Sequence, residues 1–190
     1  GVITVAFNMI ILKLAGNVGV AAYGVVANIS LVAVALFNGI AQGSQPLVSE
    51  SYGKGKMQDV KYVGRLAIRT AVVLAVLIIA AIYIWSDPIA SIFNSEKNME
   101  LAAYAREGVR LYFLGFLFAG VNIVATSALS AVEAVRWAFA SSIMRGFAAI
   151  LIFAFVLSAA FGMTGVWLAF PAAELVTMVL SIAGLRKSLK

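Results

Sequence analysis

Long runs of apolar residues, separated by short polar segments, dominate the chain. A helix needs roughly 20 mostly apolar residues to cross the hydrocarbon core of a bilayer. Five runs reach about that length, and a sixth at the start is too short to span fully. Polar and turn-forming residues fill the gaps, as in the Gly-rich basic segment 51–56 and the polar segment 94–98. We predict spans at 1–14 (partial), 18–48, 66–85, 111–132, 137–161 and 164–185.

The pattern therefore predicts an all-α integral membrane protein, a six-helix transmembrane bundle over residues 1–190 with a truncated first helix. The chain begins with Gly and runs straight into apolar sequence. A signal peptide would show a basic segment and a small-residue cleavage site, and neither is present. We interpret the chain as a segment of a longer protein.

Composition supports this class and excludes several others. Hydrophobic residues make up 63% of the chain and charged residues 12%, whereas soluble domains carry about a quarter charged residues. There is no His and no Cys in the chain, so we expect no imidazole or thiol nucleophile, no soft-metal site and no disulfide. No Ser has a recognisable base in its sequence context. We expect no enzymatic activity, no bound metal and no cofactor.

The placement of the basic residues predicts the orientation. The net charge is +6, but the cations fall at the ends of apolar runs, which is unlike a nucleic-acid-binding surface. Basic residues are concentrated on the cytoplasmic side of membrane proteins. With Arg145 set aside inside a span, nine cations fall on one side and four on the other, so we predict a cytoplasmic C-terminus. The nine are Lys54, Lys56, Lys61, Arg65, Arg69, Arg136, Arg186, Lys187 and Lys190; the four are Lys13, Lys97, Arg106 and Arg110.

Amide side chains gather in the first long span. Asn38, Gln42 and Gln45 are spaced to share one helical face, and Asn28 lies about 80° from Asn38 at roughly 100° per residue. Neutral amides both donate and accept hydrogen bonds, which suits a water-filled cavity with broad specificity. Alternatively, these amides form interhelical hydrogen bonds that only hold the bundle together.

Two prolines lie inside predicted spans. Pro46 follows the amide face, and Pro171 lies three residues before Glu174. Proline inside a helix frees a carbonyl and allows a bend, so both are candidate hinges for a transporter. A structural kink without a gating role is the alternative for each.

Glu174 is the carboxylate placed deep in a span. An ionisable residue at that depth is a functional candidate, here for binding a cation or a proton. The alternative is an ion pair with Arg145 of the neighbouring span.

Asn122, Thr126 and Ser130 form a polar stripe, although small hydroxyl groups commonly serve close helix packing. Aromatic residues between 112 and 118 are interpreted as packing or lipid-facing.

Several segments resemble the multidrug and toxic compound extrusion (MATE) family. Residues 11–16 (ILKLAG) leading to 20–24 (VAAYG) are similar to the join between its seventh and eighth helices. Residues 39–48 (GIAQGSQPLV), followed by Tyr52 and Gly53, resemble the end of its eighth helix. Residues 142–146 (SIMRG) are similar to the start of its eleventh helix. Residues 162–171 (GMTGVWLAFP), with Glu174, resemble the entry to its twelfth.

This resemblance implies the C-terminal lobe of a twelve-helix bacterial transporter in the inner membrane. Such proteins export organic, often cationic, compounds against Na⁺ or H⁺ by alternating access. The implied partners are an N-terminal six-helix lobe, membrane lipid and a small organic substrate. Some members carry acidic residues in the seventh and tenth helices; here the tenth-helix region has Asn122 instead. The main ion site is therefore expected in the N-terminal lobe, and the coupling ion stays open.

Two other functions remain open at this stage. One is a flippase for lipids or lipid-linked oligosaccharides from the same superfamily. Flippases tend to line their cavity with several cations, whereas Arg145 alone is embedded here. The other is a non-transporting membrane subunit, in which the polar residues only pack helices.

Overall fold

The protein is almost entirely helical in the computed structural model, which describes residues 2–92 and 98–189. Of the predicted polar segment 94–98, only Asn98 belongs to the described residues; Lys97 and Lys190 lie outside them. Asn98 caps the third helix, because its side chain accepts the backbone N–H groups of Glu100 and Leu101 at 2.9 and 3.1 Å. The helices are α1 (Val2–Gly53), α2 (Met57–Ile92), α3 (Met99–Leu114), α4 (Phe116–Ala131), α5 (Val135–Ile143), the π-helical segment η1 (Met144–Ala148) and α6 (Ala149–Ser188).

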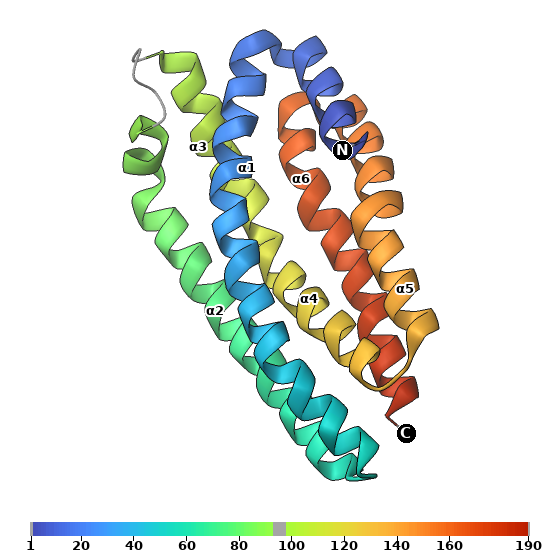
Figure 1. Cartoon of the computed structure of the whole chain (residues 1–190). Coiled ribbons are helices and arrows are strands. Elements are labelled where there is room, and N and C mark those ends of the chain that lie inside the picture. Colours follow the sequence, from blue (N-terminus) through green and yellow to red (C-terminus); the bar gives the residue numbers. More distant parts are fainter. Residues whose placement is uncertain (1, 93–97, 190) are drawn as a thin grey trace.

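Two glycines divide the longest helices. Gly16 in α1 has φ 60° and ψ −156°, and Gly162 in α6 has φ 58° and ψ −134°. Side chains other than glycine rarely tolerate these angles. The chain turns back on itself at both positions (Figure 1). Divided there, the described residues form rods at 2–15, 17–53, 57–92, 99–131, 135–161 and 163–188.

The helices extend beyond the predicted spans. The span predicted at 66–85 lies inside α2, which begins at Met57 and continues to Ile92. The span predicted at 111–132 is the apolar part of a longer rod, α3 and α4 together, bent by 43°. Counted as unbroken helices, three are long and apolar enough to cross a membrane, or up to four with this bent pair. Division of the last of these helices at Gly162 gives a fifth full-length rod, and division of α1 at Gly16 separates the short first segment.

The two prolines named as hinges do not coincide with these breaks. Pro46 lies inside α1 and Pro171 inside α6, and the backbone angles that depart from a helix lie at Gly16, Trp85 and Gly162. Trp85, with φ −109° and ψ 17°, comes three residues before Pro88. α2 is thus distorted locally at Trp85 and continues through Pro88 to Ile92.

α4 occupies the centre of the bundle. It packs against α1, α2, α5 and α6, and most of its residues are buried, including Val124 and Ala125. Large apolar residues such as Leu31, Ile84 and Val179 are instead exposed on the outside of the bundle. In water such a surface would be unfavourable, but against lipid chains it carries no penalty. The bundle is therefore built to be surrounded by lipid.

The basic residues separate to opposite ends of the bundle. One end holds the junction between α1 and α2, the turn between α4 and α5, and the last turn of α6 (Figure 1). Lys54, Lys56, Arg136 and Arg186 belong to these segments. The turns at Gly16 and Gly162 lie at the other end (Figure 1). These four described members of the larger predicted group thus lie at one end of the bundle, and Lys13 of the smaller group lies three residues before the turn at Gly16 at the other end.

Candidate functional site

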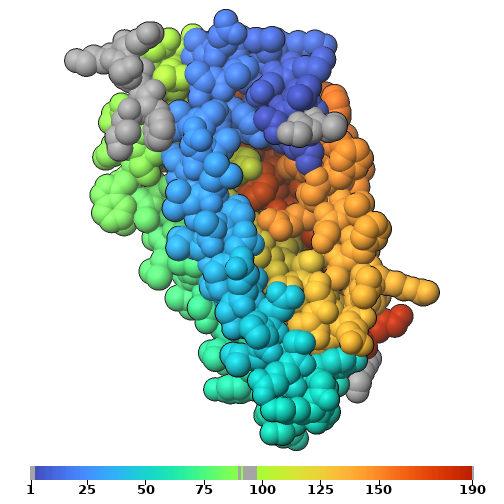
Figure 2. All heavy atoms as spheres, viewed as in Figure 1, coloured from blue at the N-terminus to red at the C-terminus, as the bar shows by residue number. Residues whose placement is uncertain are grey.

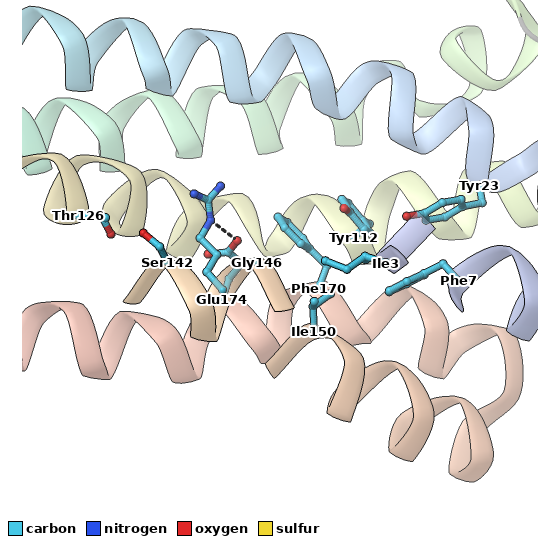
Figure 3. Close-up of a pocket in the computed structure, with 11 residues that line it drawn as sticks. Ile3, Phe7, Tyr23, Tyr112, Thr126, Ser142, Gly146, Ile150, Phe170 and Glu174 are labelled. Atoms are coloured by element: carbon cyan, nitrogen blue, oxygen red, sulfur yellow. Dashed lines mark hydrogen bonds and ion pairs between the residues drawn. The ribbon is translucent and has the colours of Figure 1, made fainter. Parts of the chain in front are cut away.

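Glu174 is the buried anion around which the site is organised. Its side chain is 3% exposed and points toward η1, where Arg145 Nε donates to Glu174 Oε1 at 2.8 Å (Figure 3). Asn122 of α4 donates its Nδ2 to Glu174 Oε2 at 2.7 Å and to the Glu174 backbone carbonyl at 2.8 Å. Both carboxylate oxygens therefore have a hydrogen-bond donor, which is what a buried charge requires.

The polar network continues one side chain further along α6. Ser181 Oγ donates to Asn122 Oδ1 at 2.8 Å, and both residues are fully buried. Ser181 follows Glu174 by seven residues, about two helical turns, so the two lie on one face of α6 toward α4. The network thus joins η1, α6 and α4 through buried hydrogen bonds.

A π-helical segment carries Arg145. Residues 144–148 adopt the wider π turn between α5 and the first part of α6. Such segments are rare and occur frequently at functional sites. The Arg145 side chain remains 29% exposed, so its charge meets both the buried Glu174 and the adjoining space. An ion pair with Arg145 is the predicted alternative to a cation- or proton-binding role for Glu174, and the structure contains this ion pair.

A cavity of about 390 Å³ adjoins the ion pair. Figure 2 shows a hollow on this face between α1 and the α5–α6 region, with α4 and α6 at its floor. Its apolar part is aromatic: the Tyr112 and Phe170 rings stack with centroids 4.2 Å apart, and Phe7 stacks on Tyr23 at 5.4 Å (Figure 3). The lining consists of Ile3, Phe7, Tyr23, Tyr112, Thr126, Ser142, Arg145, Gly146, Ile150, Phe170 and Glu174.

A flat apolar ligand in this cavity would meet two aromatic stacks and one ion pair. Aromatic faces bind planar rings and cations. A cation that approaches Glu174 meets a carboxylate already engaged by Arg145 and Asn122, and must compete with them. The site can therefore couple ligand or ion binding to the position of Arg145.

The predicted site residues fall into two groups. Glu174 and Thr126 line the cavity, and Asn122 joins it through Glu174. The amides Asn28, Asn38, Gln42 and Gln45 do not line it. Asn28, Gln42 and Gln45 are exposed on α1, and Asn38 is half-buried. Pro46 is exposed near the end of α1, whereas Pro171 follows Phe170 at the cavity.

Sequence reasoning did not identify the aromatic lining or the role of the π turn. Tyr23 is not among the predicted site residues, and the sequence pattern gives Tyr112 as a packing or lipid-facing residue. An aromatic residue in an apolar run offers no contrast that would identify a cavity. The sequence features that point to Arg145 as a site residue are its charge within a predicted span and the adjacent Gly146.

The fold and the site together define a polytopic helical membrane protein with a charged network beside a cavity. The MatE family model matches residues 2–146, about three quarters of the chain, and the chain therefore belongs to the MatE family. No match is found among curated proteins.

Solved structures share the fold at low sequence identity. The chain is similar to a MATE structure in complex with MaL6 (TM-score 0.91, 16% identity), covering 98% of this chain and 42% of that one. It is similar to the Vibrio cholerae MATE transporter VcmN (0.90, 16%; 99% and 42%). It also resembles a MOP superfamily transporter from Pyrococcus furiosus, described as having a binding pocket of reverse polarity (0.84, 15%; 98% and 41%). The chain thus spans less than half the length of these proteins.

Proposed function

We propose that this chain forms one lobe of a secondary active transporter that exports small organic compounds, often cations, in exchange for Na⁺ or H⁺. The observation that carries the proposal is the aromatic cavity beside the Arg145–Glu174 ion pair. Membership of the MatE family supports it, because structures of similar fold are described as multidrug resistance transporters in outward- and inward-facing conformations. Alternating access follows if ions or substrate bind the two conformations with different affinity.

The substrate is proposed to bind against the aromatic stacks. A planar organic cation would contact the Tyr112 and Phe170 rings and approach the carboxylate of Glu174. Dispersion and cation–π contacts tolerate many shapes, which fits broad specificity. Thr126, which also lines the cavity, supplies a hydroxyl group that donates or accepts.

We propose that the main site of the coupling ion lies in another part of the transporter. A coupling ion that reaches this lobe acts on the Arg145–Glu174 pair. A proton or Na⁺ at Glu174 weakens the attraction for Arg145. A cation left partly buried without its partner is unfavourable, so the surrounding helices are expected to rearrange until it is solvated or paired again. Because η1 and α6 carry the two charges, this rearrangement changes the relative position of these segments.

A second lobe is the proposed partner of the exposed amide face. Asn28, Gln42 and Gln45 are exposed on α1, where exposed apolar residues such as Leu31 and Leu36 lie between them. Amides facing lipid lack hydrogen-bond partners, whereas a facing lobe or a water-filled path between lobes provides them. The greater length of the similar structures agrees with such a partner. We place the assembly in the bacterial inner membrane with the Lys54–Lys56 end in the cytoplasm.

Lipid flippase activity and a purely structural role are the competing functions. The cavity lining contains one cation, Arg145, and that cation is already paired with Glu174. A phosphate-bearing substrate therefore has little net positive charge to bind. Reconstitution in liposomes separates the three functions. Substrate-dependent ion flux supports antiport, and lipid movement between leaflets supports a flippase. The absence of both activities supports a structural subunit.

The experiment that tests the proposal removes the charge of Glu174 in the complete transporter. Glu174→Gln keeps an oxygen that accepts from Asn122 but abolishes the ion pair, so we expect dye efflux from cells to fall at least tenfold. Asp87→Asn is the matched control, because Asp87 forms an exposed ion pair with Arg106 away from the cavity. Efflux should then remain within about twofold. Normal efflux by Glu174→Gln at equal expression would restrict Glu174 to a structural role.

A further inference from the structure

A second hollow lies between α2 and α6, and the network around Glu174 takes no part in it. This groove has a volume of about 630 Å³. Two sets of residues at the same spacing line it: Lys61, Gly64, Arg65 and Ile68 from α2, and Ile182, Leu185 and Arg186 from α6, followed by Leu189 at the C-cap of that helix. Residues spaced by three, four and seven share one helical face. The groove is thus a continuous channel between two facing stripes.

The floor of the groove is part of the packed bundle. Ile68 and Leu189 pack against the buried cluster that includes Ala125 and Leu129 of α4. α2 and α6 therefore flank α4 at this end of the bundle, and the groove follows the gap between them. A ligand in the groove would meet an apolar wall that is already in place.

The charges of the groove are all positive. Lys61, Arg65 and Arg186 are exposed, and no Asp or Glu lies in the lining. None of the ion pairs within the described residues involves these three cations. Arg65 Nε donates to the Lys61 carbonyl at 3.1 Å, which holds its guanidinium along the helix beside Lys61. The groove therefore presents three cations to an anionic group.

Lys61 and Arg186 lie toward the end of the bundle, and Ile68 and Ile182 lie deeper along the same helices. Lys61 lies in the second turn of α2, near the end of the bundle, and Ile68 lies roughly 10 Å deeper along the helix at 1.5 Å per residue. On α6, Arg186 lies near the same end, and Ile182 lies one turn deeper. A phospholipid has the same order, because its phosphate lies in the interface and its acyl chains lie in the hydrocarbon core.

We propose that this groove is a binding site for an anionic phospholipid. The phosphate contacts Lys61, Arg65 and Arg186, and an acyl chain lies along Ile68, Ile182 and Leu185. Basic pockets between transmembrane helices are suited to anionic headgroups, whose attraction adds to burial of the chain. Gly64, a member of the α2 stripe, leaves open space in the groove, since nothing lies within 4 Å of where its Cβ would be. The bound lipid would join α2 to α6.

The test measures lipid adducts on the purified, complete transporter by native mass spectrometry. Phosphatidylglycerol and cardiolipin are compared with phosphatidylcholine, with inorganic phosphate as a competitor. We expect the anionic lipids to bind at least tenfold more tightly than phosphatidylcholine, and millimolar phosphate not to displace them. Equal binding of phosphatidylcholine would overturn the charge argument. Displacement by phosphate would assign the cations to a free anion instead of a lipid.

Two variants assign the binding to the groove. The combined change Lys61→Gln, Arg65→Gln and Arg186→Gln should weaken anionic lipid binding at least tenfold. The matched control, Lys54→Gln with Lys56→Gln and Arg136→Gln, removes three charges from the same end and should change binding less than twofold. Gly64→Phe retains every charge but fills the groove, and it should also displace the lipid. Unchanged binding in both groove variants would exclude this site.

Discussion

Asn122 is the residue on which most of the buried hydrogen bonds at the site depend. Its amide nitrogen serves both the carboxylate and the backbone carbonyl of Glu174, and its oxygen accepts from Ser181. A side-chain amide donates through its nitrogen and accepts through its oxygen, so this one residue serves Glu174 and Ser181 together. A carboxylate in this position would face Glu174 at hydrogen-bond distance and repel it. The identity of residue 122 thus follows from the charge of residue 174.

Replacement of Asn122 by Leu is expected to destabilise the protein by roughly 1–3 kcal/mol. Leu has a similar volume but leaves Glu174 Oε2 without its donor in a buried setting, which costs the desolvation energy of that group. Thermal unfolding in detergent measures the change. Thr177→Val is the control, because Thr177 is equally buried but donates only to Ala173 of its own helix. Equal destabilisation by both variants would mean that the network adds nothing beyond local packing.

At the residue scale, sequence identified the polar members of the site better than the apolar ones. Asn122, Thr126 and Glu174 stood out because a polar side chain in an apolar span needs a partner. The structure places all three at or beside the cavity. The four amides of α1 carried the same signal, yet they lie outside this cavity. A polar residue therefore indicates that a partner is needed, but the sequence does not say which element provides it.

At the scale of elements, the chain reverses at two glycines and not at the two prolines that we proposed as hinges. The prolines Pro46 and Pro171 were the natural candidates for bends, but the helices continue through them. Membrane helices tolerate proline because neighbouring groups satisfy the freed carbonyl. The reversals occur instead at Gly16 and Gly162, where φ is positive. Hydropathy likewise located the apolar core of each span but not its full length, because the helices continue into the polar interface.

Alanine at Gly16 or Gly162 is expected to destabilise the bundle by roughly 1–3 kcal/mol each. Both positions have positive φ with an extended ψ, a region that side chains with a Cβ rarely adopt. The Cβ itself meets no neighbour at either position, so the cost comes from the backbone alone. Thermal unfolding in detergent is again the measurement.

Gly39→Ala provides the comparison for these two variants. Gly39 lies inside α1 with helical angles and open space around its Cβ position, so alanine there should be neutral or slightly stabilising. If all three variants had the same stability, the turns at Gly16 and Gly162 would not require glycine.

At the scale of the whole molecule, the fold class could be predicted from the sequence. The connections between the rods could be predicted only in part. The apolar runs and scarce charges predicted a helical membrane bundle, and the exposed apolar surface agrees with it. Among the described residues, Lys54, Lys56 and Arg186 lie at the end of the bundle that holds the junction between α1 and α2, and Lys13 lies near the turn at Gly16. The central position of α4 was not predictable, because hydropathy ranks it with the lipid-facing spans; packing against four neighbouring helices identifies it.

The orientation of the molecule is the last prediction, and the composition of the chain makes it directly testable. Because this chain contains no Cys, a single introduced thiol is the only one it carries. We expect Lys56→Cys to be labelled by a membrane-impermeant maleimide only in everted vesicles, since cations favour the cytoplasmic side. Arg106→Cys, near the opposite end, should be labelled in intact cells. Any Cys elsewhere in the complete transporter is replaced first, and labelling of both sites from the outside would reject a single orientation. Labelling of Lys56→Cys alone in intact cells would place the lipid groove and the C-terminal end of α6 outside the cytoplasm.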